Sequence, residues 1–175
     1  MSLMNTKDSF GSITRTLHWL LAVLVIGMLT VGLLLSDIGS PLVYKIHKFT
    51  GLVVLTVAII SILWNMCNVR PGYDAMPRIQ EILAKSVHHL LLLCVVIMPL
   101  SGWVFSTAAG KPPMLGSLAL PMPFIPHDPE LVHWGVTVHG FIANILIGLI
   151  VIHTLAALTH HFILKDNILK RMVKG

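Results

Sequence analysis

Four long apolar runs, separated by shorter polar segments, form the dominant pattern along this chain of 175 residues. A helix needs about 20 apolar residues to cross the roughly 30 Å hydrocarbon core of a bilayer. The pattern predicts membrane-spanning helices at about residues 16–35, 46–64, 86–105 and 134–163. Pro99 falls inside the third run and is expected to kink that helix. We therefore expect an all-α membrane protein, a four-helix bundle that forms a single membrane domain over residues 1–175.

Composition supports a lipid environment. Hydrophobic residues make up 55% of the chain and charged residues only 11%, whereas about a quarter of a soluble domain is charged. The net charge of +5 could suggest binding to nucleic acid. However, the basic residues lie between and beyond the apolar runs, which is typical of membrane topology. We expect a lipid bilayer as partner and no nucleic acid.

The distribution of basic residues predicts an orientation. Loops on the cytoplasmic side of a membrane carry an excess of Lys and Arg. The amino end, the second connection and the tail hold Lys7, Arg15, Arg70, Arg78, Lys85, Lys165, Lys170, Arg171 and Lys174. The opposite side holds only Lys45, Lys48 and Lys111. Both termini are therefore expected in the cytoplasm.

The third connection, residues 106–133, is rich in proline. It contains six of the 10 prolines: Pro112, Pro113, Pro121, Pro123, Pro126 and Pro129. A long loop of this composition is expected to be ordered and extended, and to cover the outer face of the bundle.

Histidines are the main candidates for chemistry. The chain has 10 of them, and most fall in or at the ends of the spans, where ionisable residues are costly and usually functional. His139 and His153 lie 14 residues apart in the fourth span. This spacing is close to four helical turns, so both side chains leave the same face, about 21 Å apart along the axis. One helix thus presents two imidazoles at opposite depths.

Each of these imidazoles has a candidate partner at its own depth. His47 lies at the outer start of the second span, and His18 lies near the inner end of the first. Pairs of histidines on facing helices can hold haem in a helical bundle. Zinc usually takes three or four ligands, often with cysteine or carboxylate. We therefore favour haem, with histidines hydrogen-bonded between helices as the alternative. Gly51 and Gly140 could let a macrocycle approach the backbone, or could simply allow close helix packing.

Basic residues lie close to these histidines. Arg15 precedes His18 by three residues and could pair with a haem propionate on the same face. Lys45 and Lys48 flank His47. They could extend toward head groups or pair with a propionate, or they could attract a small anion toward an outer haem.

The chain resembles the bacterial cytochrome b561 family in several combined motifs. These are R-x-x-H-W from Arg15 to Trp19, H-x-x-x-G from His47 to Gly51, the 14-residue spacing of His139 and His153, and A-x-x-H-H-x-x-x-K-D-N from Ala157 to Asn167. The resemblance implies a multi-pass protein of the bacterial inner membrane that holds two haem b groups. It places His18 and His153 on the inner haem iron, and His47 and His139 on the outer one. It also implies electron exchange with ubiquinone or ubiquinol and, as in characterised relatives, oxidation of superoxide.

Two further positions follow from the resemblance. His88 and His160 match histidines of the family near the inner haem, where quinone is thought to bind. For their neighbours His89 and His161 we favour contacts with lipid head groups. Lys85 stands where the family often has another histidine, so that position gives no support.

The leading hypothesis is a superoxide:quinone oxidoreductase, which transfers electrons from superoxide on the outer side to ubiquinone in the membrane. A protein partner is not required for this activity. One alternative is a haem b subunit that links quinone to a partner dehydrogenase or hydrogenase. A second alternative is a transporter of protons or of a non-haem metal that uses the same histidines.

Overall fold

The computed structural model describes residues 2–69, 71–72 and 77–174. Its helices are α1 (Ser12–Ile38), α2 (Pro41–Met66), α3 (Arg78–Ala108), α4 (Pro129–Phe162) and α5 (Ile168–Val173). Two short antiparallel strands, β1 (Met114–Leu115) and β2 (Leu118–Ala119), form a hairpin between α3 and α4. Arg70, one of the residues used to predict the orientation, lies outside the described residues.

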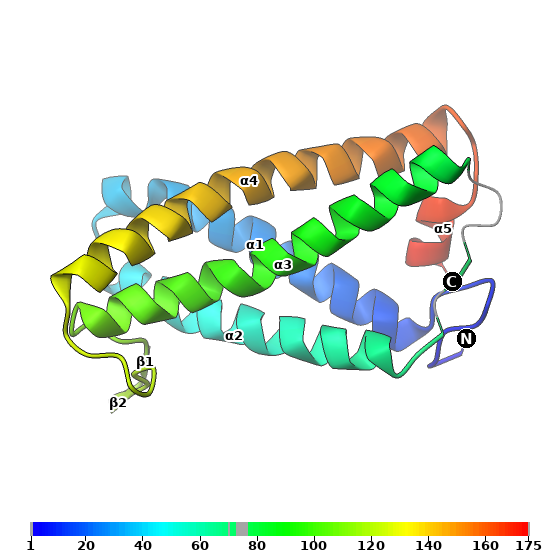
Figure 1. Ribbon diagram of the computed structural model, residues 1–175. Coiled ribbons are helices and arrows are strands. Elements are labelled where there is room, and N and C mark those ends of the chain that lie inside the picture. The colour runs from blue at the N-terminus through cyan, green and yellow to red at the C-terminus, as the bar shows by residue number, and fades with distance from the viewer. Residues whose placement is uncertain (1, 70, 73–76, 175) are drawn as a thin grey trace.

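The four long helices form one bundle. Each of α1 to α4 is long and apolar enough to cross a membrane, which confirms the predicted fold class. Neighbours in the sequence pack against each other, α1 on α2, α2 on α3, and α3 on α4. Both chain termini lie at one end of the bundle and the β-hairpin lies at the other (Figure 1). We call these the terminal end and the hairpin end.

The helices extend beyond the predicted spans. The prediction covered only the apolar runs, whereas the helices continue into the polar residues at their ends. α4 begins at Pro129, where the side chain of Asp128 accepts a hydrogen bond from the backbone N–H of Glu130 at 2.8 Å and so caps the helix. His133, expected in the loop, therefore lies inside α4. α3 begins at Arg78, eight residues before the predicted start of the third span, and so takes in part of the second connection.

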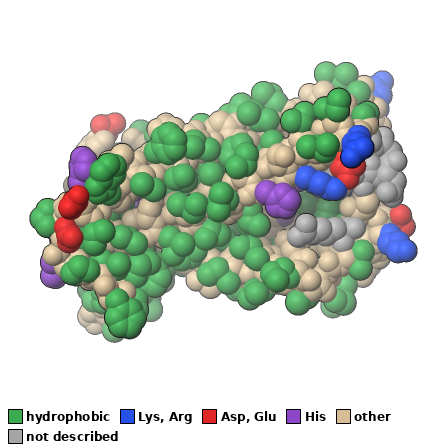
Figure 2. All heavy atoms as spheres, viewed as in Figure 1, with side chains coloured by type: hydrophobic (Ala, Val, Ile, Leu, Met, Phe, Trp, Pro, Cys, Tyr) green, Lys and Arg blue, Asp and Glu red, His purple; other side chains and the backbone are tan. Residues whose placement is uncertain are grey.

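Few side chains of the bundle are shielded from its surroundings. The core consists of Val25, Leu29, Val54, Cys94 and Leu146. Many other large apolar side chains are exposed, and hydrophobic side chains cover the long sides of the molecule in Figure 2. Charged side chains gather toward the two ends in the same view. A soluble bundle shows the opposite distribution, so the exposed faces fit contact with lipid.

The loop at the hairpin end is tied to α3 by side-chain hydrogen bonds. The indole N–H of Trp103 donates to the carbonyl of Leu120 at 2.8 Å. The hydroxyl of Thr107 accepts from the backbone N–H of Met122 at 3.0 Å. These bonds hold the loop against the bundle, as its proline content predicted. The short strands inside it are the only departure, among the described residues, from an all-α structure.

At the terminal end, α5 folds back against the start of α1. The indole N–H of Trp19 donates to the carbonyl of Met172 at 3.1 Å, and Arg15 Nη1 donates to the carbonyl of Val173 at 3.1 Å. This short helix was not predicted, since six residues carry too little periodic pattern to be recognised.

Candidate functional site

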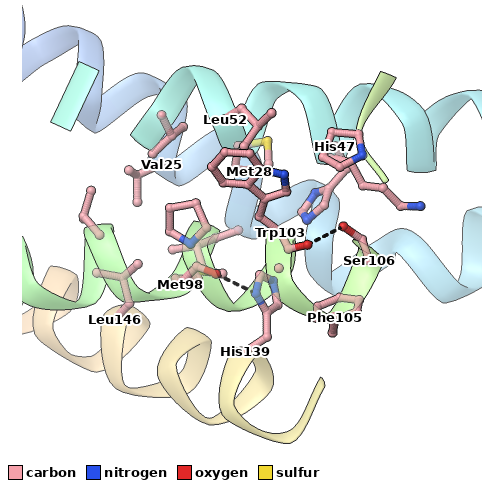
Figure 3. Close-up of a pocket in the computed structure, with 18 residues that line it drawn as sticks. Val25, Met28, His47, Leu52, Met98, Trp103, Phe105, Ser106, His139 and Leu146 are labelled. Atoms are coloured by element: carbon pink, nitrogen blue, oxygen red, sulfur yellow. Dashed lines mark hydrogen bonds between the residues drawn. The ribbon is translucent and has the colours of Figure 1, made fainter. Parts of the chain in front are cut away.

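His47 and His139 face each other toward the hairpin end. α2 supplies His47 and α4 supplies His139, and their ring centroids lie 6.4 Å apart with an angle of 74° between the ring planes. Both line a largely apolar cavity to which α1 and α3 also contribute side chains. Figure 3 shows the two imidazoles pointing into this cavity from opposite sides. The fold thus brings together the pair that the sequence placed at one depth.

A hydrogen bond to α3 fixes the ring of His139. Its Nδ1–H donates to the carbonyl oxygen of Met98 at 2.9 Å (Figure 3). The hydroxyl of Ser101 donates to the same carbonyl at 2.7 Å and lies 3.2 Å from Nδ1. Because a carbonyl can only accept, Nδ1 carries the proton and Nε2 keeps its lone pair. This is the arrangement in which a neutral histidine can bind a metal ion through Nε2.

Two glycines make room for the imidazoles. A Cβ at Gly102 would lie 3.2 Å from Cε1 of His139, and a Cβ at Gly32 would lie 3.3 Å from Cε1 of His47. Gly51 lines the cavity, as its spacing from His47 suggested. A Cβ at Gly140 would meet no atom within 4 Å, and this glycine is exposed on α4. No protein atom approaches Gly140 in the described part of the chain, so a role for this glycine toward a macrocycle stays a prediction.

A second group of histidines lies toward the terminal end. His18 of α1 and His153 of α4 have ring centroids 6.2 Å apart, with 63° between their planes. His88 of α3 adds a third imidazole, 5.1 Å from that of His153. α4 therefore presents His139 to one group and His153 to the other, as the 14-residue spacing predicts.

The two pairs have the spacing that haem iron requires. Each ligating nitrogen lies about 2 Å from its metal and about 1 Å from its own ring centre, so two opposed imidazoles have centroids about 6 Å apart. The observed 6.4 Å and 6.2 Å match this value. In addition, Nδ1 of His47 is buried with no hydrogen-bond partner in the described part of the chain. The residues present therefore fit haem held by paired histidines.

The structure separates the two candidate steering lysines. Lys48 lines the cavity, and its ammonium group donates to the backbone carbonyl of Lys111 at 2.8 Å. Lys45 is exposed and is not among the residues that line this cavity. Only Lys48 therefore lies where its charge acts directly on the hairpin-end site.

The two candidate quinone residues have different surroundings. His88 contacts His153, whereas Nδ1 of His160 is paired with the carboxylate of Asp166. His160 lies seven residues beyond His153 on α4, about 10 Å farther along the axis. Asp166 also accepts a hydrogen bond from the backbone N–H of Ile168, so the turn after α4 holds its carboxylate in place.

Several residues of the site were not found from the sequence. They are the carbonyl of Met98, the hydroxyl of Ser101, and the glycines at 32 and 102. All four belong to helices other than the one that carries the histidine they contact, and their roles depend on how the helices are rotated. Pro99 was the one feature of the sequence that pointed to this part of α3, and it lines the cavity.

Comparison with known proteins agrees with this arrangement. The family model described as prokaryotic cytochrome b561 matches residues 9–175. The chain is 32% identical to "Cytochrome b561 homolog 2" of Escherichia coli (strain K12), over 99% of this chain and 95% of that protein. It is 27% identical to "Probable superoxide oxidase CybB" of Yersinia pestis, over 90% of this chain and 91% of that protein. The chain therefore belongs to the prokaryotic cytochrome b561 family, as a haem b-binding, multi-pass electron-transfer protein of the bacterial inner membrane.

Proposed function

We propose that the chain holds two haem b groups and transfers electrons from superoxide on one side of the membrane to ubiquinone. His47 and His139 would hold one haem at the hairpin end, and His18 and His153 would hold the other at the terminal end. The observation that carries this proposal is the pair of centroid distances, 6.4 and 6.2 Å, at two depths along α4. Arg15, one turn before His18, is the proposed partner of a propionate.

When bound, the two haems supply one-electron transfer between the two ends of the bundle. Two histidines at each site would hold each haem iron, and ligation by paired imidazoles would favour electron transfer over oxygen activation. The hydrogen bond from His139 to Met98 fixes the imidazole and leaves its Nε2 lone pair available, so His139 would be able to hold haem iron there. Side chains from all four helices line the hairpin-end cavity, and most of them are apolar.

Superoxide is the proposed donor at the hairpin end. A 27% identical relative is named as a probable superoxide oxidase. Lys48 lies beside the cavity with its ammonium group held by the Lys111 carbonyl. A fixed positive charge at this point raises the local concentration of a small anion. Lys45 contributes from a greater distance.

Ubiquinone is the proposed acceptor at the terminal end, near His88 and His160. Two superoxide ions each lose one electron and become dioxygen, and one ubiquinone takes up two electrons and two protons to become ubiquinol. With its Nδ1 paired to Asp166, His160 can present Nε2 to a quinone oxygen and deliver a proton there. The predicted orientation places this end on the cytoplasmic side, which would supply the protons.

The test is to supply superoxide enzymatically to the purified protein in nanodiscs that contain ubiquinone. We expect ubiquinol to form, and we expect excess superoxide dismutase to stop it. His139→Ala is the matched variant, because it removes one of the two proposed hairpin-end ligands and leaves the terminal-end pair unchanged. This variant should abolish the reaction. Haems that dithionite reduces but superoxide does not would show that the donor is wrong while the haem assignment stands.

A further inference from the structure

The loop at the hairpin end has an unusually apolar composition. Residues 112–126 contain no Asp, Glu, Lys or Arg, and Ser117 is the only one with a polar side chain. A loop of 15 residues in water normally carries charged side chains. This segment is instead composed mainly of proline, leucine and methionine.

The loop turns several of these apolar side chains outward. Leu115 and Leu118, on the two strands of the hairpin, are 53% and 59% exposed. Phe124 is fully exposed, at 102%, and its backbone has φ of 64°. This left-handed conformation is unfavourable for a bulky side chain. The chain thus holds a phenyl ring outward in a conformation that is itself costly.

The loop is fixed in this arrangement. Pro113 is fully buried and lines the hairpin-end cavity. The backbone N–H of Leu120 donates to the carbonyl of Pro113 at 2.9 Å, and the carbonyl of Leu120 accepts from Trp103. These contacts fix the base of the loop. The outward side chains therefore stay exposed to whatever surrounds the hairpin end.

The exposed loop continues the lipid-facing surface of the bundle. β1 packs against α2, and Leu42 and Ile46, in the first turns of α2, are themselves exposed. In Figure 1 the hairpin lies to the side of the hairpin end, level with the last turns of the helices. Figure 2 shows hydrophobic side chains gathered on the same lateral projection. The loop therefore lies level with the ends of the apolar helices, and it points sideways.

We propose that Leu115, Leu118 and Phe124 form a membrane anchor that inserts into the interface of the lipid leaflet at the hairpin end. Aromatic and leucine side chains on an uncharged segment partition into this layer, between head groups and acyl chains. The occupant is lipid, because the apolar side chains are continuous with faces that already contact the bilayer. The base of the same loop lines the hairpin-end cavity through Pro113. The anchor would therefore hold this part of the loop against the cavity.

The test uses the haem-loaded protein with Cys67→Ser and Cys94→Ala, reconstituted in vesicles of phosphatidylcholine and phosphatidylglycerol. A cysteine at Phe124 or Leu118 carries an environment-sensitive NBD probe. We expect blue-shifted emission, strong quenching by nitroxide-labelled lipid and weak quenching by aqueous iodide. The matched control is Glu130→Cys, at the exposed start of α4, where iodide should quench more strongly than the lipid nitroxide.

A second variant tests the contribution of Phe124 directly. With the probe at Leu118, Phe124→Asp should shift the emission toward that of water, whereas Phe124→Leu should leave it in the lipid range. Unchanged haem absorbance shows that each variant is folded. Water-like emission in the vesicles before any further substitution would overturn the proposal. The proposal would also be overturned if the probe were protected from iodide in native membranes but not in the vesicles. That result would indicate a protein partner in place of lipid.

Discussion

Gly102 on α3 and Gly140 on α4 both lie near His139, but their surroundings differ completely. A Cβ at Gly102 would meet the His139 ring at 3.2 Å, whereas a Cβ at Gly140 would meet nothing within 4 Å. The first distance is tighter than ordinary van der Waals contact, and the ring is already held by the Met98 carbonyl. Glycine at position 102 therefore fixes where the imidazole can lie.

Gly102→Ala should displace His139 by a few tenths of an ångström and weaken its bond to iron. We expect the loss of most of one haem per chain, or a shift in the absorption of one haem, because ligand geometry sets both. Gly140→Ala is the matched control and should change neither. Haem content and the low-temperature absorption spectrum measure the effect. Equal behaviour of the two variants would show that His139 does not need this space.

α4 carries one proposed ligand of each haem. It presents His139 and His153 on one face at two depths, and Leu146 between them is buried in the core. This feature was predictable from the sequence, because helical periodicity and a 14-residue spacing determine the shared face. The roles of Gly32, Gly102 and the Met98 carbonyl were not predictable. They depend on the packing of separate helices, which no local pattern encodes.

One alanine inserted between Gly148 and Leu149 tests the shared face. It should rotate His153 by about 100° relative to His139 and shift it by about 1.5 Å. Both histidines remain in the chain, yet we expect a decrease of one haem, measured by the pyridine haemochrome assay.

The control is one alanine inserted between Ala156 and Ala157, beyond the pair. It keeps the 14-residue spacing and should preserve both haems. If the first insertion also keeps the full haem content, the two imidazoles do not need a common face.

For the whole molecule, the sequence predicted four spans and the structure confirms them. Both termini lie at one end of the bundle (Figure 1), as an even number of crossings requires. The side on which that end lies remains a prediction from the distribution of Lys and Arg. The loop and α5 were less predictable than the spans, since their positions depend on hydrogen bonds to distant helices such as those of Trp103 and Trp19.

The orientation can be measured by cysteine labelling in intact cells, in a background with Cys67→Ser and Cys94→Ala. A cysteine at Lys7 or Lys174 should stay unlabelled by a membrane-impermeant maleimide until the cells are opened. A cysteine at Lys111 should react at once. The reverse pattern would place the termini outside and would require another source of protons for the quinone.

Electrostatic attraction of the donor should depend on Lys48 more than on Lys45. Lys48→Gln should slow haem reduction by superoxide roughly two- to tenfold at low ionic strength and make the rate less sensitive to salt. Lys45→Gln is the control, because that side chain is exposed and does not line the cavity, and its effect should be smaller. Stopped-flow absorbance gives both rates. An unchanged rate for Lys48→Gln would remove this lysine from the proposed mechanism.

The most direct test of the proposed haem sites is the ratio of haem b to protein after expression with sufficient haem. Two opposed imidazole pairs at separate depths predict two haems per chain, both low-spin in the absorption spectrum. A colourless protein, or a single haem per chain, would contradict the assignment of His18, His47, His139 and His153 as two ligand pairs.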